Sequence, residues 1–447
     1  MIKIDEREIE KGISPEMLTK LIRINETERD KNKKLYDYYL GRHYILNREK
    51  KSTGTANNRV MSNHAKFIVE MERSYIAGNP IIYSASEGFD IEEIKNAYSE
   101  QNISKLDNDI IKDVILFGKT YELIYANEEN KVRSVKLLPF EAFLVCSARA
   151  DKKALFGVNY YSVYDIDGQF KRTECIVYDS ENIYTYSGSG ADYSGLRLVN
   201  TEAHYFGDIP LIEHRNNEEE QGDIEQVISL IDAYNLLMSD RVNDKEQFVD
   251  AFLFLKNLDI DTETAKQLKK EKILLGYEDS DAKYLSKIMT ESDIKVLRDD
   301  IKEDIHRMSM VPDMSDQSFG NNLSGVAIKY KLLAMENNIK NKETYFVESL
   351  KSRFTLYNNY LVLMNKMQHV PVHRISITFN YNLPANLLEL SQMIGNLKGT
   401  VSNQTLLAQL PFVDDEAEEA AALQKETAEE YNRKTEEIEK LAQGGGW

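Results

Sequence analysis

The sequence predicts an α+β fold in which a strand-rich region is followed by a set of long helices. Short segments between residues 120 and 213 are rich in Val, Ile, Tyr and Phe, alternate with period two and are separated by turn clusters, as antiparallel strands usually are. Apolar residues at helical spacing then recur over long stretches that begin at Asp223, Ser292 and Ser324. The last stretch, together with the polar loop before it, is the most distinctive segment of the chain.

The composition is that of a folded chain. Its 447 residues are 42% hydrophobic and 10% aromatic, which is enough for roughly two to four structural units with sizeable cores. The formal net charge of −18 argues against tight, extensive binding of nucleic acid, because such binding requires many Lys and Arg contacts to phosphates. Cys146 and Cys175 form no CxxC pattern and no Cys/His cluster, so neither a disulfide framework nor a structural zinc site is expected.

No targeting or membrane-spanning segment is expected. The first ten residues are rich in charge, and no apolar run approaches the length of a membrane span. We therefore expect a soluble chain in a reducing, intracellular compartment.

The N-terminal part is predicted to be mainly helical, with one polar, basic loop. In chain order we expect helix within 1–40, the loop over 39–54, helix over 62–76, a short strand over 81–83 and further helix over 91–117. Gly78 followed by Pro80 is a typical signal for the end of the second of these helical stretches.

The strand-rich region is expected to form antiparallel β structure. Turn clusters such as 165–168 and 187–190 separate its segments. The predicted strands are 120–125, 132–138, 143–146, 157–164, 172–178, 182–186, 196–199 and 210–213. A polar connector over 216–222 then leads to the long helices.

The second half alternates long helices with shorter elements. The first long helix is predicted from Asp223 to residue 256, and a compact α/β insert follows over 257–290, with a strand at 272–276. Another helix over 291–311 returns the chain to the polar loop 313–323. A surface loop beside a bundle helix is the simplest interpretation of that loop.

The longest helix is predicted from Ser324 to residue 367. No proline interrupts it before Pro371, and at roughly 1.5 Å per residue it would span on the order of 60 Å. Its apolar residues recur at helical spacing on one predicted stripe: Val326, Leu332, Leu333, Ile339, Phe346, Leu350, Phe354, Tyr357, Leu361 and Met364. Ser324 is a suitable N-cap, whereas the Gly- and Asn-rich residues before it favour a loop.

The C-terminal part is predicted to begin with a strand over 373–381. Helical patterns over 387–397 and 402–410 follow. From Asp414 the chain is rich in alanine and glutamate, and we expect a helix there that frays into disorder.

The segment Gly118-Lys119-Thr120 resembles the end of a phosphate-binding loop. That motif would require a glycine where Asp113 stands, and a helical pattern instead of a strand precedes it. A nucleotide-dependent enzyme is therefore the weakest of our hypotheses. It predicts ATP binding that is lost in Lys119→Ala, and we expect no ATP binding.

Other catalytic and metal sites are not indicated. The seven histidines form no HExxH motif, and Asp313, Asp316 and Asn321 lack the spacing of a calcium-binding loop. No serine nucleophile elbow or Cys/His pair is visible. We expect no catalytic residue, no cofactor and no metal ion.

A lysine cluster lies in the predicted insert. It consists of Lys266, Lys269, Lys270 and Lys272. A nucleic-acid contact is one interpretation, but a solvated helix face or a protein-docking surface is favoured in a chain of this net charge.

Several separated motifs carry a resemblance to a known family. They are Asn57-Asn-Arg-Val60, Ala65-Lys-Phe-Ile-Val69, Tyr75-Ile-Ala-Gly-Asn-Pro80, Leu137-Leu-Pro-Phe-Glu141, Gly207-Asp-Ile-Pro-Leu-Ile-Glu213, Asn216-Asn217, Gly222-Asp-Ile-Glu225, Leu230-Ile-Asp-Ala-Tyr-Asn235, Asn243-Asp244, Pro312-Asp-Met314 and Ser324-Gly-Val-Ala-Ile-Lys-Tyr330. Through their number and order, the chain resembles the portal proteins of tailed bacteriophages that infect Gram-positive hosts. None of the motifs is catalytic.

The resemblance implies the portal fold, with an α/β wing, long stem helices, a small α/β clip and a short helical C-terminal crown. On this mapping the wing is 1–222 with the strand in 368–384, the stem helices are 223–256 and 291–311, the clip is 257–290, the tunnel loop is 313–323, the long helix is 324–367 and the crown is 385–447. The tail beyond residue 412 departs most from the family pattern.

The resemblance also implies a function. Portal proteins form a ring at one capsid vertex, through which DNA is packaged and ejected and on which the packaging motor and head–tail connector dock. We expect a homo-oligomer of about twelve or thirteen subunits, or a monomer in isolation. The implied partners are double-stranded DNA that passes non-specifically, the terminase large subunit, a head–tail adaptor, and scaffolding and major capsid proteins, without a membrane. The implied location is the virion, and the host cytoplasm during assembly.

The tunnel loop would face the DNA. Its expected DNA-facing residues are Asp313, Ser315, Asp316, Gln317, Ser318, Asn321 and Asn322. Such polar, uncharged or acidic side chains can contact the DNA backbone without reading base sequence and without holding the DNA in place. The lysines of the clip would instead dock an acidic partner surface. A helical interaction scaffold without a pore is the alternative function.

Overall fold

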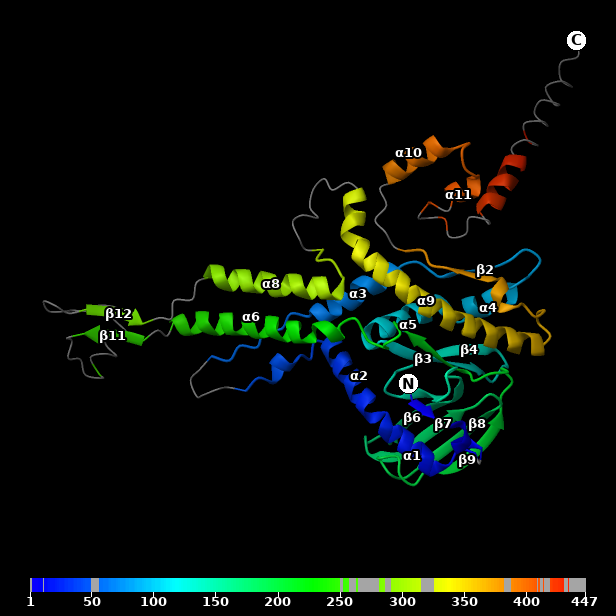
Figure 1. Ribbon diagram of the computed structural model, residues 1–447, viewed down its shortest axis with the longest axis horizontal. Coiled ribbons are helices and arrows are strands. Elements are labelled where there is room, and N and C mark those ends of the chain that lie inside the picture. The colour runs from blue at the N-terminus through cyan, green and yellow to red at the C-terminus, as the bar shows by residue number, and fades with distance from the viewer. Residues whose placement is uncertain are drawn as a thin grey trace, which may run out of the picture. The chain divides into compact units, whose positions relative to one another are not determined.

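The computed structural model describes residues 2–10, 12–49, 56–249, 252–256, 263, 281–285, 291–314, 325–381, 387–407, 409–410, 413, 419–429 and 433. The chain divides into two compact units (Figure 1). Unit 1 comprises Met1–Tyr36, Phe67–Glu225 and Met310–Trp447, and unit 2 comprises Asp37–Lys66 and Gln226–Ser309.

Six described strands form the larger sheet of unit 1, in the spatial order β1-β5-β6-β7-β8-β9. They are β1 (Ile2–Ile4), β5 (Ala142–Ser147), β6 (Ala154–Tyr164), β7 (Phe170–Tyr178), β8 (Asn182–Gly188) and β9 (Arg197–Ala203). Neighbours are antiparallel except β1, which runs parallel to β5. Helix α1 (Pro15–Ile24) packs on this sheet, because Leu18, Leu21 and Ile22 share its hydrophobic core.

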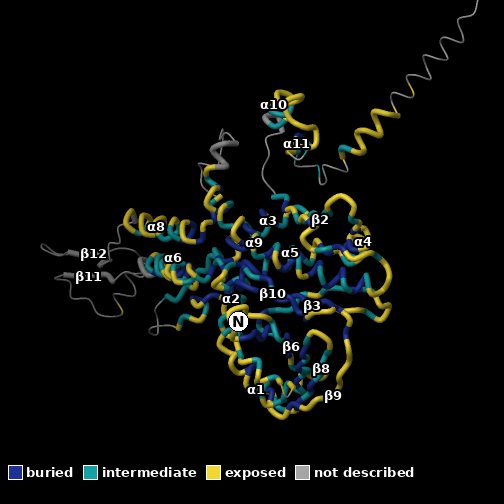
Figure 2. The backbone as a smooth tube through the Cα atoms, turned by 45° about the vertical axis from the view of Figure 1, so that its right-hand side comes forward, coloured by how far each residue is buried: buried dark blue, intermediate teal, exposed yellow. Residues whose placement is uncertain are grey.

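A second sheet of unit 1 has the order β10-β3-β4 among the described residues and is antiparallel throughout. Its strands are β3 (Lys119–Ala126), β4 (Val132–Leu137) and β10 (Leu211–Arg215). Strands β3 and β10 are largely buried, whereas every residue of β9 is exposed (Figure 2). The smaller sheet is therefore an internal layer of the unit.

Helices and a short ladder surround the smaller sheet. They are α4 (Glu92–Glu100), α5 (Ile103–Phe117), and the pair β2 (Ile82–Ala85) and β13 (Ile375–Thr378). The remaining elements before and after them are η1 (Glu6–Ile9), α2 (Glu26–Tyr39), α3 (His64–Ile76), η5 (Val372–Arg374), α10 (Leu387–Leu397) and α11 (Asn403–Leu407). Residues 419–429 are also helical.

Helix α9 (Gly325–Leu363) has 39 residues and packs on β10, β4 and α4. Its apolar buried side chains are Leu332, Met335, Ile339, Phe346, Leu350, Phe354, Leu356, Tyr357, Tyr360 and Leu361. Leu333 and Met364, which were predicted on this stripe, are 49% and 40% exposed. Leu333 lies about 100° around the helix from Leu332, and Met364 lies beyond the end of the helix.

In unit 2, two long helices lie side by side (Figure 1). The chain enters the first, α6 (Ile228–Val249), through η3 (Glu225–Val227), and the second is α8 (Glu291–Ser309). Strand β11 (Phe252–Lys256) pairs antiparallel with β12 (Asp281–Leu285), and η2 (Tyr44–Asn47) lies against α6.

The first long helix differs from the prediction at both ends. It was predicted over 223–256, but it begins at Ile228, ends at Val249, and gives way to β11. The run Phe252-Leu-Phe-Leu255 is short and apolar, and periodicity alone does not separate a helix from a strand in such a run. The ladder with β12 is what selects the strand.

Other boundaries change where the backbone turns left-handed. The helix predicted over 91–117 is two helices, because Asn102 between α4 and α5 has φ 55°. Helix α8 ends before Met310, which has φ 59°, and α9 is followed by Asn365 with φ 55°. Such conformations end a helix and are uncommon outside glycine. The strand-rich region also forms two sheets, and the three-residue β1 was too short to predict.

No helix in the described ranges is long and apolar enough to cross a membrane.

Candidate functional site

The loop between α8 and α9 is the candidate site that the sequence predicts. Of its expected DNA-facing residues, Asp313 lies within the described ranges, whereas Ser315, Asp316, Gln317, Ser318, Asn321 and Asn322 lie outside them. The expected docking lysines Lys266, Lys269, Lys270 and Lys272 also lie outside the described residues. What the structure describes is therefore how the two ends of the loop are held.

Both ends of the loop are anchored in unit 1. Before it, Val311 is fully buried, and Asp313, two residues later, is half-buried. After it, Tyr330 of α9 is 74% exposed and Leu332 is buried. The loop thus leaves from one buried apolar residue and returns to another on α9.

Helix α9 is fixed to the unit by a buried guanidinium. Arg353 is fully buried; its Nε donates to Oε1 and Oε2 of Glu122 on β3 at 2.8 and 2.9 Å, and its Nη1 donates to Oδ1 of Asp107 on α5 at 2.6 Å. Nη1 also lies 3.3 Å from the hydroxyl of Tyr83 on β2. A planar donor fork between carboxylates fixes orientation as well as distance.

The same cluster extends to β10 through a histidine. His214 Nε2 lies 2.9 Å from Glu122 Oε2, and its Nδ1 lies 2.7 Å from Ser349 Oγ on α9. Burial alone would raise the pKa of Glu122, but Arg353 and His214 outweigh burial and lower it to about 2. Burial outweighs Arg353 at Asp107 and raises the pKa of that carboxyl. Four elements are thus joined to α9 by one ionic network.

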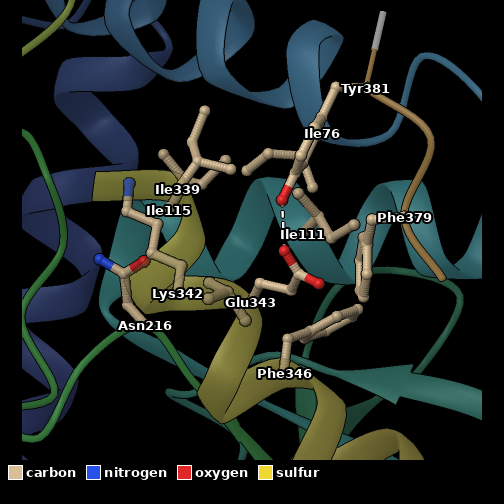
Figure 3. Close-up of a pocket in the computed structure, with 11 residues that line it drawn as sticks. Ile76, Ile111, Ile115, Asn216, Ile339, Lys342, Glu343, Phe346, Phe379 and Tyr381 are labelled. Carbon is tan, nitrogen blue, oxygen red and sulfur yellow. Dashed lines mark hydrogen bonds between the residues drawn. The ribbon is translucent and has the colours of Figure 1, made fainter. Parts of the chain in front are cut away.

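A second buried cation lies three turns earlier on α9. Lys342 Nζ donates to Glu72 Oε2 on α3 and to Asp223 Oδ2 in the connector before η3. Beside it is a small cavity of about 20 Å³, lined mainly by apolar side chains such as Ile111, Ile339 and Phe346 (Figure 3). That volume is about enough for one water molecule, so the cavity is a packing feature and not a ligand pocket.

Helix α6 of unit 2 accepts a ladder of hydrogen bonds through neutral side chains. The backbone N–H groups of Asn58, Val60 and Ser62 donate to Asn243 Oδ1, Ser239 Oγ and Asn235 Oδ1 at 2.6, 2.9 and 2.8 Å. Two residues of extended chain span about 6.6 Å and four residues of helix about 6 Å, so alternate N–H groups match every fourth side chain.

Asn235 has a further buried partner. Its Nδ2 lies 2.9 Å from Nδ1 of His43, whose ring stacks on Tyr38 at 4.7 Å between centroids. His43 Nε2 lies 2.9 Å from the carbonyl of Tyr38, and the hydroxyl of Tyr38 donates to Asp232 of α6. The motif Asn57-Asn-Arg-Val60 therefore contacts α6 at Ser239 and Asn243, whereas Asn235 of the motif Leu230-Ile-Asp-Ala-Tyr-Asn235 contacts Ser62 and His43.

The segment that resembled a phosphate-binding loop is a structural junction. Lys119 is buried and its Nζ donates to Glu220 Oε2 at 2.6 Å. Gly118 has φ 85°, and a Cβ there would lie 2.2 Å from the carbonyl oxygen of Glu220. Glycine and lysine are therefore used to pack the connector over 216–222 against the end of α5.

Helical spacing marks the two buried cations of α9 in the sequence itself. Lys342 and Arg353 both lie on the stripe that carries Ile339, Phe346 and Tyr357. A cation at a buried position of an amphipathic helix requires an anionic partner inside the fold.

In the described residues, no group of three or more His, Cys, Asp or Glu side chains could hold a metal ion.

Comparisons with known proteins agree with the sequence motifs. The model of a family described as "Phage portal protein, SPP1 Gp6-like" matches residues 18–433. The portal protein of Bacillus phage SPP1 is 25% identical over 432 residues, which cover 92% of this chain and 84% of the phage protein. The portal protein of Clostridium phage phiCD119 is 22% identical over 435 residues, which cover 89% and 94%. A chain in the solved neck of an empty GTA particle, computed with C6 symmetry, is similar with a TM-score of 0.45 and 14% identity, covering 79% of this chain and 90% of that one.

Proposed function

Because this chain belongs to the SPP1 Gp6-like family of phage portal proteins, we propose that it forms a ring-shaped channel through which DNA is packaged and ejected. Its function is that of a portal protein at the capsid vertex. The family match does not favour the alternative of a helical scaffold without a pore. The ring, its size of about twelve subunits and its place in the virion are parts of the proposal.

The proposal rests on how the helix that follows the loop 313–323 is fixed in unit 1. A polar loop that meets moving DNA must hold its position without binding tightly, since many Lys–phosphate contacts would stall the DNA. Here the loop returns to a helix of 39 residues that is tied to β3 and α5 through Arg353 and to β10 through Ser349. A polar, neutral-to-acidic loop on a rigid helix would let DNA pass through a channel without binding it tightly.

The partners of the ring follow from charge. A chain of net charge −18 presents few sites for DNA, so DNA would pass without sequence recognition. The lysines of the predicted clip would dock an acidic surface of the terminase large subunit during packaging and of the head–tail adaptor afterwards. Scaffolding and major capsid proteins would contact the outside of the ring. We propose no enzyme activity for the chain itself.

Deletion of Ser315–Asn322 tests the role of the loop. We expect the fold and the ring to persist, because both anchors of the loop are retained, while the amount of DNA packaged or retained per particle falls. A matched control replaces the same eight residues with Gly and Ser, which keeps the length and removes the Asp, Gln and Asn side chains. Wild-type DNA content in particles built from the deletion variant would remove the loop from the mechanism.

Charge reversal in the clip tests partner docking separately. Changing Lys266, Lys269, Lys270 and Lys272 to Glu should weaken binding of the purified terminase large subunit or the adaptor while rings still form. Unchanged binding of both partners would contradict the docking role of these lysines and leave the channel proposal intact.

A further inference from the structure

Three buried charged side chains meet where the chain leaves unit 1. Lys342 of α9 donates to Glu72 of α3 and to Asp223, which lies just before η3. The side chains of Glu72, Lys342 and Asp223 are 0%, 7% and 10% exposed. The cluster therefore joins two helices and the connector out of solvent.

The charges of this cluster do not balance when both acids are ionised. Two carboxylates and one ammonium leave one net negative charge, which is costly to bury. The neighbouring polar groups are amides: Asn338 Nδ2 lies 3.5 Å from Glu72 Oε1, and Asn216 Nδ2 lies 3.0 Å from Asp223 Oδ1. Amide donors reduce this cost but do not supply the missing positive charge.

The charged groups around the cluster have their own partners. On α9, Glu336 and Glu343 accept hydrogen bonds from Tyr75 and Tyr381, and the second of these is drawn in Figure 3. On α3, Arg73 pairs with Glu70 and with Asp109 of α5. At the start of η3, Glu225 pairs with Lys31. The face of α5 beside the cluster carries Ile111 and Ile115. The charged groups that act on Glu72 are Asp223 and Lys342.

The electrostatics agree with this imbalance. Burial, together with repulsion from Asp223, raises the pKa of Glu72 to about 8, although Lys342 opposes the rise. Burial alone would lower the pKa of Lys342, but Asp223 and Glu72 outweigh it and raise that pKa, so the ammonium stays charged. A proton on Glu72 makes the buried cluster neutral.

We propose that Glu72 is protonated at neutral pH, and that this proton holds the segment Gly222–Glu225, where the connector reaches η3, against the rest of unit 1. The Asp223 N–H also ties this segment to α5 by donating to the carbonyl of Ile115 at 2.9 Å, and within the segment the Gly222 N–H donates to Glu225 Oε1 at 2.7 Å. The segment packs closely, since a Cβ on Gly222 would lie 2.2 Å from the carbonyl oxygen of Leu116.

Loss of the proton should loosen the connector. Asp223 is the most exposed of the three charged side chains, so its movement toward solvent is the shortest way to relieve the repulsion. Such a movement breaks the contact of Asp223 with Lys342. It also strains the hydrogen bond that the Asp223 N–H donates to the carbonyl of Ile115. Helix η3 begins two residues after Asp223, so loss of the proton should also loosen the start of η3.

The sign of the pH dependence follows from linkage. The folded-state pKa of Glu72 lies above its ordinary value of 4.5, so the folded protein binds more protons than the unfolded chain between pH 4.5 and about 8. The contribution of this group to stability is therefore fully present below the unfolded pKa and is lost as the pH rises through about 8.

Glu72→Gln in the full chain tests the role of this proton, because an amide mimics the protonated carboxyl. At pH 4 the variant should have the Tm of the wild type, and its Tm should exceed that of the wild type increasingly from pH 4.5 to about 8, by several degrees at pH 9. Hydrogen exchange of the peptide 220–227 at pH 9 should be slower in the variant by about tenfold, since the segment stays held. Glu336→Gln, one turn and a half away on α9, is the control and should keep the wild-type pH dependence.

The double variant Glu72→Gln/Asp223→Asn tests whether Lys342 needs one carboxylate. It leaves Lys342 without a carboxylate, so it should be less stable than either single variant at every pH. A Glu72→Gln chain that fails to fold, or that is less stable than the wild type at pH 9, would overturn the proposal. Equal Tm values for this variant and the wild type from pH 6 to pH 9 would overturn it as well.

Discussion

Helix α9 of unit 1 is held by buried ion pairs, whereas helix α6 of unit 2 is held mainly by neutral hydrogen bonds, beside the contacts of Tyr38 with Asp232 and of Arg48 with Asp240. Arg353 and Lys342 tie α9 to buried carboxylates on β3, α5, α3 and the connector. Helix α6 is tied to an extended segment by neutral amide and hydroxyl groups that accept backbone N–H bonds.

This difference predicts how much stability each helix loses when one polar partner is removed. Removing one member of a buried ion pair leaves an uncompensated charge, so α9 should lose much stability at once. Each bond of the α6 ladder contributes little by itself, and its loss mainly leaves one backbone donor without a partner. We infer that α9 is a rigid support and that several individually weak hydrogen bonds hold α6 in register.

The largest expected effect is that of Arg353→Met. It leaves Glu122 and Asp107 buried without their cation, and we expect unit 1 to lose about 3–5 kcal/mol of stability. Differential scanning calorimetry should show a lower transition for that unit. Lys340→Met, at an exposed position of the same helix, is the control and should change the Tm little. A wild-type thermogram for Arg353→Met would mean that the cluster does not hold α9.

Acid should break the same cluster. The folded-state pKa of Glu122 is about 2, below its ordinary 4.5, so its stabilising contribution is present above pH 4.5 and lost as the pH falls toward 2. This contribution amounts to at most about 3 kcal/mol. Urea unfolding from pH 5 to pH 2.5 should show a smaller decline in Glu122→Gln than in the wild type. Parallel declines would assign the acid sensitivity to other carboxyl groups.

A smaller effect is expected for Asn235→Ala on α6. The substitution removes the acceptor of the Ser62 N–H and the partner of His43, so we expect a loss of about 1–3 kcal/mol, in the transition of unit 2. Leu236→Ala is the neighbouring control, because Leu236 is 45% exposed. If Asn235→Ala cost as much as Arg353→Met, the contrast between the two helices would fail.

The smallest effect is expected on the outside of α8. Arg307 pairs with Glu303 and Asp304, but these side chains are 46–67% exposed. Exposed ion pairs contribute little, so Arg307→Ala should shift stability by less than about 0.5 kcal/mol. A shift of more than about 1 kcal/mol in the free energy of unfolding would show that this exposed ion pair does stabilise α8.

Periodicity predicted most elements of this chain but not the polar contacts between them. The strands from β3 to β10 and helices α3, α8, α9 and α10 lie within a few residues of their predicted positions, because their alternation is regular. The division into two sheets, the strand β11 and the break at Asn102 depend on pairing and backbone turns that a single segment does not encode.

The candidate site shows the same limit. The loop 313–323 was predicted from its composition, and its position relative to DNA stays a prediction. The supports of the loop depend on Lys342 and Arg353, whose partners are separated from them by more than 100 residues of sequence. Spacing on a helix can mark such cations as buried, but only the fold determines which carboxylates receive them.

Electron cryomicroscopy of the assembled protein is the most direct test of the account. We predict a ring with a central channel in which α9 is straight and the loop 313–323 lines the narrowest part. A ring whose loop faces outward, or an assembly without a central hole, would contradict the proposal that this loop meets the DNA.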